Sequence, residues 1–169
     1  SDVYKRQDLH LVADGQRVEP HAVDSRRHGY QGIYRFHLHR APKQLAIVSH
    51  SCVPMRMGLT HDPRRLGVAL RSIALRGSGV ETRVDYDSVL LSDGFDEPEP
   101  GPRHRWTNGR AALPRAASRV FDGAFELSLD VVCTSRYPVA DACGETETRP
   151  VRQGDRFGSR RIAGGSNRF

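Results

Sequence analysis

The longest part of the sequence that is typical of a single β-strand runs from Arg64 to Leu75. Its apolar residues occupy alternate positions and change parity once: Leu66, Val68 and Leu70 come first, and Ile73 and Leu75 follow. Because successive side chains of a strand point to opposite faces, a change of parity predicts a bulge or a bend. We therefore expect a strand that buries one face and bends near Arg71 and Ser72.

Shorter alternating runs recur along the chain and are separated by turn signals such as Asp14-Gly15 and Asn108-Gly109. These runs predict further strands over residues 8–13, 17–23, 33–38, 44–49, 80–86, 111–113 and 123–132. No apolar period of 3.6 residues persists for three helical turns. The pattern therefore predicts an all-β fold, specifically an antiparallel β-sandwich that is jelly-roll-like.

The segments between these strands are also constrained by their residue types. Pro20 cannot donate a ladder hydrogen bond, so the strand over 17–23 is expected at a sheet edge. A polar loop is expected over 24–29. A longer loop, rich in glycine, proline and acidic residues, is expected over 87–103.

The chain divides into three parts. Residues 1–7 resemble a translated sequencing adapter at the end of a metagenomic read, so they are treated as an adapter-like artefact and the chain as a fragment. Residues 8–139 form the predicted sandwich domain. From residue 140 to 169 the apolar pattern stops, which predicts a disordered C-terminal tail. This tail is either native linker sequence or the product of a frameshift.

Composition limits the classes of partner. The chain of 169 residues carries a formal net charge of +6, but its basic residues are arginines except for Lys5 and Lys43. They do not alternate with aromatic residues as in RNA-binding modules, so nucleic acid is not an expected partner. No apolar run approaches the roughly 20 residues of a membrane span. Cys52 and Cys133 lie in apolar runs and are expected to be small buried side chains.

Two short motifs resemble parts of metal or catalytic sites. His37 and His39 share one face of a strand, which is half of a metal site. The apolar side chains at 34, 36 and 38 face the other way, so both imidazoles are expected in solvent. Asp85-Tyr86-Asp87 matches the D-x-D pattern of some glycosyltransferases, but a turn with solvated carboxylates is the favoured interpretation. No catalytic residue, cofactor or metal site is predicted, and the chain is not expected to be an enzyme.

The long loop ends at Trp106, the only tryptophan. On an exposed face its ring would stack against a sugar, whereas under the loop it would be a buried core residue, which is the favoured interpretation. In the sugar-binding interpretation, the charged residues of the loop would contact sugar hydroxyls beside the stacked ring. The candidate ligand-binding residues are therefore Trp106, Arg105, Asp93, Glu97 and Glu99. Internal ion pairs in a solvated loop are the alternative role for the charged members.

Several blocks of the sequence resemble a known module in their order and spacing. They are Leu9–Gly15, Leu45–Ser49 with Val53-Pro54, Asp62–Leu70 with Ile73 and Leu75, and Arg105–Gly109 with Ala112-Leu113. Together they resemble the C-terminal β-rich module that follows the Hint (hedgehog/intein) domain in proteins of acetic-acid bacteria and related alphaproteobacteria. The resemblance covers about residues 8–137. The region from Glu99 to Trp106 is also similar to β-sandwich modules attached to bacterial glycosyltransferases.

The resemblance implies a non-catalytic accessory or binding module of a larger, exported, self-processing protein. Its partners would be the upstream domain of the same polypeptide and, as one hypothesis, a glycan. An inert structural domain and a sandwich appendage of a glycosyltransferase are the alternatives, and a metal-dependent enzyme or sugar transferase is a third class. The Hint motifs for self-processing, an N-terminal Cys or Ser, a Thr-x-x-His block and a terminal His-Asn pair, are not present. An extracellular or cell-surface location would follow from the resemblance alone.

Overall fold

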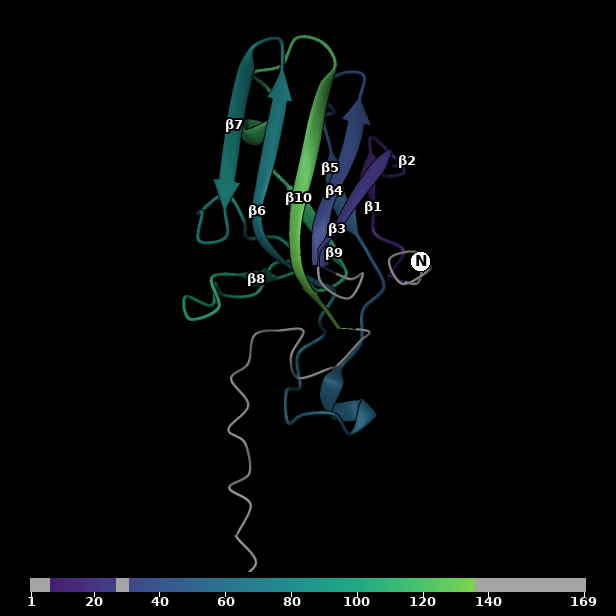
Figure 1. The fold of residues 1–169 in the computed structure, drawn as a ribbon, viewed down its shortest axis with the longest axis vertical. Helices are drawn as coiled ribbons and strands as arrows, with labels where there is room; N and C mark the ends of the chain where they lie inside the picture. The colour runs from purple at the N-terminus through teal and green to yellow at the C-terminus, as the bar shows by residue number, and fades with distance from the viewer. Residues whose placement is uncertain (1–6, 27–30, 136–169) are drawn as a thin grey trace, which may run out of the picture.

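The computed structural model describes residues 7–26 and 31–135 and shows two antiparallel sheets packed as a sandwich (Figure 1). The four-stranded sheet has the spatial order β2 (Gln16–Val18), β1 (His10–Ala13), β5 (Leu45–Val48) and β9 (Arg110–Leu113). The six-stranded sheet has the order β3 (Ala22–Arg26), β4 (Gln31–Leu38), β10 (Phe125–Thr134), β6 (Val68–Gly77) and β7 (Val80–Asp85), and β8 (Arg105–Trp106) pairs with β6. The predicted all-β antiparallel sandwich is confirmed.

Alternation of side chains along each strand explains the layering. In β4, Tyr34, Phe36 and Leu38 are buried while His37 is exposed. From Phe125 to Cys133, β10 alternates between buried and half-buried positions. The last strand, β10, lies between β4 and β6, so it forms the centre of its sheet (Figure 1). The predicted buried face of β4 is confirmed.

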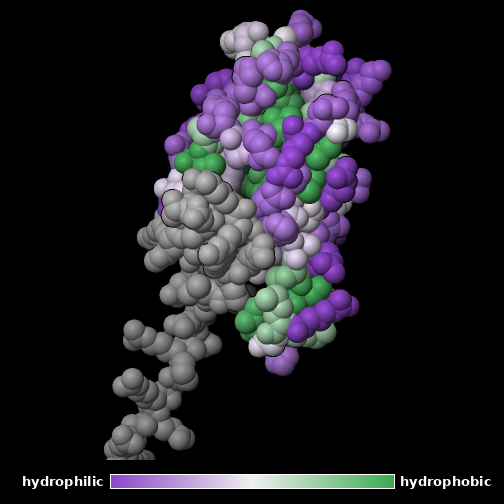
Figure 2. All heavy atoms as spheres, turned by 90° about the vertical axis from the view of Figure 1, so that its right-hand side faces the viewer, coloured by the Kyte–Doolittle hydropathy of each residue, from purple (hydrophilic) through white to green (hydrophobic). Residues whose placement is uncertain are grey.

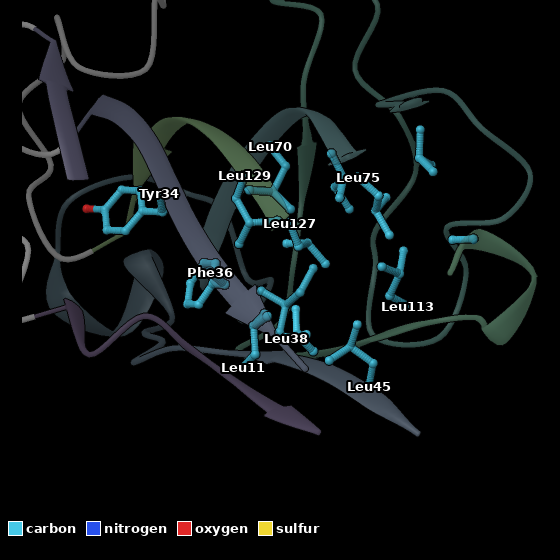
Figure 3. Close-up of a cluster of buried hydrophobic side chains, with 14 of the residues drawn as sticks. Leu11, Tyr34, Phe36, Leu38, Leu45, Leu70, Leu75, Leu113, Leu127 and Leu129 are labelled. Atoms are coloured by element: carbon cyan, nitrogen blue, oxygen red, sulfur yellow. The ribbon is translucent and has the colours of Figure 1, made fainter. Parts of the chain in front are cut away.

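The core lies between the two sheets (Figure 3). The four-stranded sheet contributes Leu11, Leu45 and Leu113, one from each of three neighbouring strands. The side chains that face them come from β4, β6 and β10, and they include Phe36, Leu38, Leu70, Leu75, Leu127 and Leu129. Burial of these apolar surfaces is the main source of stability for such a sandwich, because each large side chain removed from water contributes roughly 1.5–3 kcal/mol.

The irregularity predicted near Arg71 and Ser72 is confirmed as a β-bulge in β6. Ser72 pairs with Asp130 of β10, and the next pair joins Leu70 to Val131. Arg71 is therefore an extra residue on β6 without a pairing partner on β10. A second register shift follows at once on β10. The bulge explains why the apolar pattern of β6 changes parity at this point.

Two local predictions are wrong. The single return strand predicted over 17–23 is two strands, β2 and β3, which belong to different sheets and are separated at Pro20. Both are edge strands, as the proline predicts. The polar loop predicted over 24–29 is wrong for residues 24–26, because β3 continues to Arg26, while residues 27–29 lie outside the described part of the chain. A run of polar residues can form an edge strand because one of its faces is solvated.

The boundaries of the domain differ slightly from the prediction. Gln7 was assigned to the adapter-like segment 1–7, yet its buried side chain donates a hydrogen bond to the carbonyl oxygen of His50 at 2.9 Å. The rest of that segment, residues 136–139 and the tail over 140–169 lie outside the described residues. Within the described part of the chain, no helix is both long and apolar enough to cross a membrane.

Candidate functional site

The loop between β7 and β8 forms backbone hydrogen bonds with edge strands of both sheets. Asp96 donates its backbone N–H to the carbonyl of Trp106 at 2.9 Å, and Asn108 donates to Gly94 at 2.9 Å. Ala112 of β9 donates to the carbonyl of Asp93 at 2.9 Å. These backbone hydrogen bonds give the loop a fixed conformation, so it forms part of the scaffold.

Trp106 and Arg105 are both inside this scaffold. Trp106 is 5% exposed and packs with Leu66, Ala69 and Cys133 in a second apolar cluster. The favoured interpretation of Trp106 as a core residue is confirmed. A ring in this position has no free face for a sugar.

Arg105 is 9% exposed, and its guanidinium is directed at the loop backbone. It donates hydrogen bonds to the carbonyl oxygens of Asp96 at 2.6 Å, Ser88 at 3.1 Å and Tyr86 at 3.4 Å. The side chain therefore joins the beginning and the middle of the loop to β8. Arg105 fixes the position of its neighbours and is not directed at a ligand.

The predicted acidic residues do not gather on one face with the tryptophan. Glu99 accepts a hydrogen bond from Nε2 of the buried His104 at 2.9 Å and lies 3.5 Å from the guanidinium of Arg64. Asp93 and Glu97 are exposed. The candidate set Trp106, Arg105, Asp93, Glu97 and Glu99 is thus divided between the interior, an ion pair and the solvent.

Burial shifts the pKa values of two side chains of this loop, His104 and Asp96. Desolvation lowers the pKa of His104, although the carboxylate of Glu99 opposes the change. Desolvation raises the pKa of Asp96, and the nearby guanidinium of Arg64 opposes it. Both groups therefore favour their neutral forms more than they would in water. Their role is consistent with a buried polar network that supports the loop.

The histidine motif does not assemble into a metal site. His37 and His39 are exposed, as predicted, and their rings meet edge to face with centroids 5.3 Å apart. His50 and His61 are also exposed. Among residues 7–26 and 31–135, no group of three or more His, Cys, Asp or Glu side chains is placed to hold a metal ion.

A hollow of about 590 Å³ lies where β6 exchanges one partner strand for another. The last residue of β7, Asp85, pairs with Ser72 of β6. On the other side of Arg71, Leu70 and Ala69 of β6 pair with β8. The bulged Arg71 lies at this junction, between the β6 residues that pair with β7 and those that pair with β8. The residues that line the hollow come from β6, β7 and the long loop: Arg71, Arg83, Asp85, Tyr86, Asp87 and Arg103.

Most of this hollow could not be predicted from the sequence. Asp85-Tyr86-Asp87 matches a D-x-D motif, but the favoured interpretation was a solvated turn. The structure places that motif beside Arg71 and Arg103, which are distant from it in sequence. The predicted bulge at Arg71 was the one available signal, because bulges often redirect a side chain next to a binding site.

A second exposed feature is the projection formed by Val53–Arg65, which includes the 3-10 helix η2 (Pro54–Met57). Its base is closed by two hydrogen bonds between the backbones of Cys52 and Leu66, at 3.0 and 2.8 Å. Such a compact loop with adjacent ends is often functional. It carries three of the exposed large apolar side chains of the described chain, Met55, Met57 and Leu59, which are 49%, 54% and 40% exposed.

Figure 2 shows an apolar patch at the lower end of the described part of the molecule, at the level of this projection in Figure 1. Comparison with known proteins does not identify the patch or the hollow: no family model matches the chain, and neither a curated protein nor a solved structure matches it. The resemblance to the module that follows Hint domains therefore stays a prediction.

Proposed function

We propose that the sandwich is a non-catalytic accessory module of a larger polypeptide and that the Val53–Arg65 projection packs against a neighbouring domain of that polypeptide. The observation that carries the proposal is the position of the two ends of the described chain relative to the projection. The described part of the sandwich begins at Gln7 and ends at Ser135, and both residues lie at the base of the projection.

Three hydrogen bonds define this arrangement. Gln7 accepts a backbone hydrogen bond from His50 at 2.9 Å, two residues before Cys52. The thiol of Cys52 donates to the carbonyl oxygen of Ser135 at 3.1 Å. Ser135 in turn donates its backbone N–H to Gly67 at 3.2 Å. Any domain joined directly to either end of the sandwich would therefore begin beside the projection.

The projection has the chemistry of a docking surface. Exposed apolar side chains grouped on one feature mark interaction sites more often than scattered ones do. Methionine suits such a surface because its unbranched side chain adapts to its partner. The projection is held in shape from within, because Met55 donates its N–H to the carbonyl of Asp62 at 3.0 Å and Arg64 pairs with the Asp62 carboxylate at 2.7 Å. A rigid apolar loop loses little conformational freedom on docking.

The resemblance to modules that follow Hint domains supports the same proposal. It implies an upstream domain in the same polypeptide, and the geometry provides a surface for that domain to cover. The alternative, an inert structural domain, would leave the two methionines exposed in the intact protein. Exposure of Met55 and Met57 therefore distinguishes the two functions.

Methionine oxidation tests the proposal directly, because Met55 and Met57 are the only methionines in the chain. The chain of 169 residues and the polypeptide from the complete reading frame would be treated with peroxide, and sulfoxide formation followed by mass spectrometry. We expect both methionines to oxidise at least about tenfold more slowly in the complete polypeptide, because docking removes them from solvent.

A matched control is available at Val120, which is 49% exposed, as is Met55. Val120 precedes β10, whereas the described part of the sandwich ends after the other end of that strand. The methionine of Val120→Met should oxidise at the same rate in both proteins. Equal rates for Met55 and Met57 in the two proteins would contradict docking and favour the inert domain.

A further inference from the structure

We propose that the hollow beside the β6 bulge binds a short acidic carbohydrate, whose carboxylate or sulfate group is held by the guanidinium groups of Arg71 and Arg103. This inference goes beyond the accessory role and does not rest on the docking proposal, because the hollow is formed by other residues than the projection. It also moves the predicted glycan contact away from Trp106.

Two of the three arginines in the hollow are available to a ligand. Within residues 7–26 and 31–135, the side chains of Arg71 and Arg103 have neither an ion-pair nor a hydrogen-bond partner, and both are exposed. Arg83 differs, because its Nε donates to the carboxylate of Asp85 at 2.9 Å. A guanidinium group binds carboxylate and sulfate oxygens through parallel hydrogen bonds. The two unpaired groups therefore favour a ligand with an oxyanion.

The other lining residues favour a sugar over a bare anion. The carboxylate of Asp87 has no partner within the described part of the chain, and a carboxylate accepts hydrogen bonds from hydroxyl groups. It would repel an anion that carried no donor. The half-buried Tyr86 offers an aromatic face and a phenolic hydroxyl, the combination that suits an amphipathic ring such as a pyranose.

The hollow is also held in shape by the interior. Arg105 donates to the carbonyl oxygens of Tyr86 and Ser88, on either side of Asp87. Tyr86 donates its own N–H to the carbonyl of Arg71 at 3.0 Å. The wall that carries Tyr86 and Asp87 is therefore fixed to β6 and β8, and Arg105 is a positioning residue for it. Such prior order reduces the entropy cost of binding.

The size of the hollow sets the length of the ligand. A volume of about 590 Å³ lies in the middle of the usual range for small-molecule sites, roughly 300–1,000 Å³. All six lining residues are polar or charged, which suits a hydroxylated ligand more than an apolar one. A ligand of two or three sugar rings is therefore expected.

The test is a calorimetric titration of the purified chain with four probes: trigalacturonate, a sulfated disaccharide, neutral maltotriose and inorganic sulfate. We expect trigalacturonate or the sulfated disaccharide to bind with a dissociation constant below about 1 mM, and the tighter of the two identifies the oxyanion. Added salt should weaken the binding, because exposed charges are screened. If maltotriose or inorganic sulfate bound as tightly as the best acidic sugar, or if neither acidic sugar bound, the inference would be overturned.

Variants locate the site. Arg71→Ala and Arg103→Ala should each weaken binding about tenfold, because each removes a charged hydrogen-bond donor. Arg76→Ala is the matched control, since Arg76 is also an exposed arginine of β6 but pairs with Glu81 and does not line the hollow. If Arg71→Ala disturbed the bulge, Arg103→Ala, which changes only the exposed loop, would still show whether an arginine of the hollow binds the ligand. Unchanged affinity in both variants would overturn the inference, while the oxidation test of docking would be unaffected.

Discussion

The most specific stability prediction concerns Arg105, because a buried guanidinium that binds only backbone carbonyls is an unusual structural element. In Arg105→Met the apolar stem is retained and all three donated hydrogen bonds are lost. The carbonyl oxygens of Asp96 and Ser88 then lose donors at 2.6 and 3.1 Å, and Tyr86 loses a weaker one at 3.4 Å. The loop would be left attached by its backbone hydrogen bonds alone.

The magnitude follows from the two shorter hydrogen bonds. A hydrogen bond from a charged donor contributes about 1.5 kcal/mol at the low end of its range, so losing two costs about 3 kcal/mol. The bond at 3.4 Å is left out of this sum because it is long. For a chain of this size, about 3 kcal/mol corresponds to a fall in Tm of about 9 °C.

The assay is thermal unfolding followed by circular dichroism, with Arg103→Met as the control. Arg103 is an exposed arginine two residues away, so its substitution should change the free energy of unfolding by less than about 0.5 kcal/mol. Arg105→Met should also weaken trigalacturonate binding, because the wall of the hollow is released. A Tm within about 1 °C of the wild type would refute the assigned role of Arg105.

Three further predictions concern the core, the loop and pH. Leu127→Ala removes a fully buried β10 side chain and should lower the free energy of unfolding by about 3 kcal/mol in urea titration; a change below about 1 kcal/mol would contradict the described packing. Gly94→Ala should destabilise the chain by about 2 kcal/mol, since Gly94 has φ +82° and its added Cβ would clash with the carbonyl oxygen of Arg110. Gly101→Ala, where a Cβ meets no atom within 4 Å, should change little. Because burial lowers the pKa of His104, the unfolded state binds its proton more readily, so stability should be complete above about pH 6.5 and should fall as the pH drops below it. His104→Gln should reduce that fall in pH-dependent melting curves, and an identical pH profile would contradict the assignment.

The two-layer arrangement of this fold could be predicted from the sequence because apolar and polar residues alternate clearly along its strands. The buried face of β4 could be predicted from Tyr34, Phe36 and Leu38, and the bulge in β6 from a single change of parity. Both features depend on side-chain direction within one strand, which is a local property.

The failures involve relations between strands. Residues 17–23 were predicted as one strand because nothing in their composition shows that the chain changes sheets at Pro20. Trp106 was correctly favoured as a core residue, but the sequence did not identify its neighbours Leu66 and Cys133, which are distant along the chain. Sequence spacing alone gives neither relation.

The hollow could not be predicted for the same reason. Arg71, Asp87 and Arg103 lie on a strand, a turn and a loop, and only the exchange of strands along β6 brings them together. Tyr86 and Asp87 of the D-x-D motif lie in a turn as predicted, whereas Asp85 is the last residue of β7. The arginines that lie beside the motif are not adjacent to it in sequence.

The central claim is that β10 lies between β4 and β6 and that β6 bulges at Arg71, because this arrangement positions both the core and the hollow. Cross-strand backbone NOEs in an NMR spectrum of the labelled chain test it most directly. We expect contacts from Leu129 to both Tyr34 and Ile73, followed by contacts from Asp130 to Ser72 and from Val131 to Leu70. An unbroken register that pairs Val131 with Arg71, or parallel pairing of these strands, would contradict it.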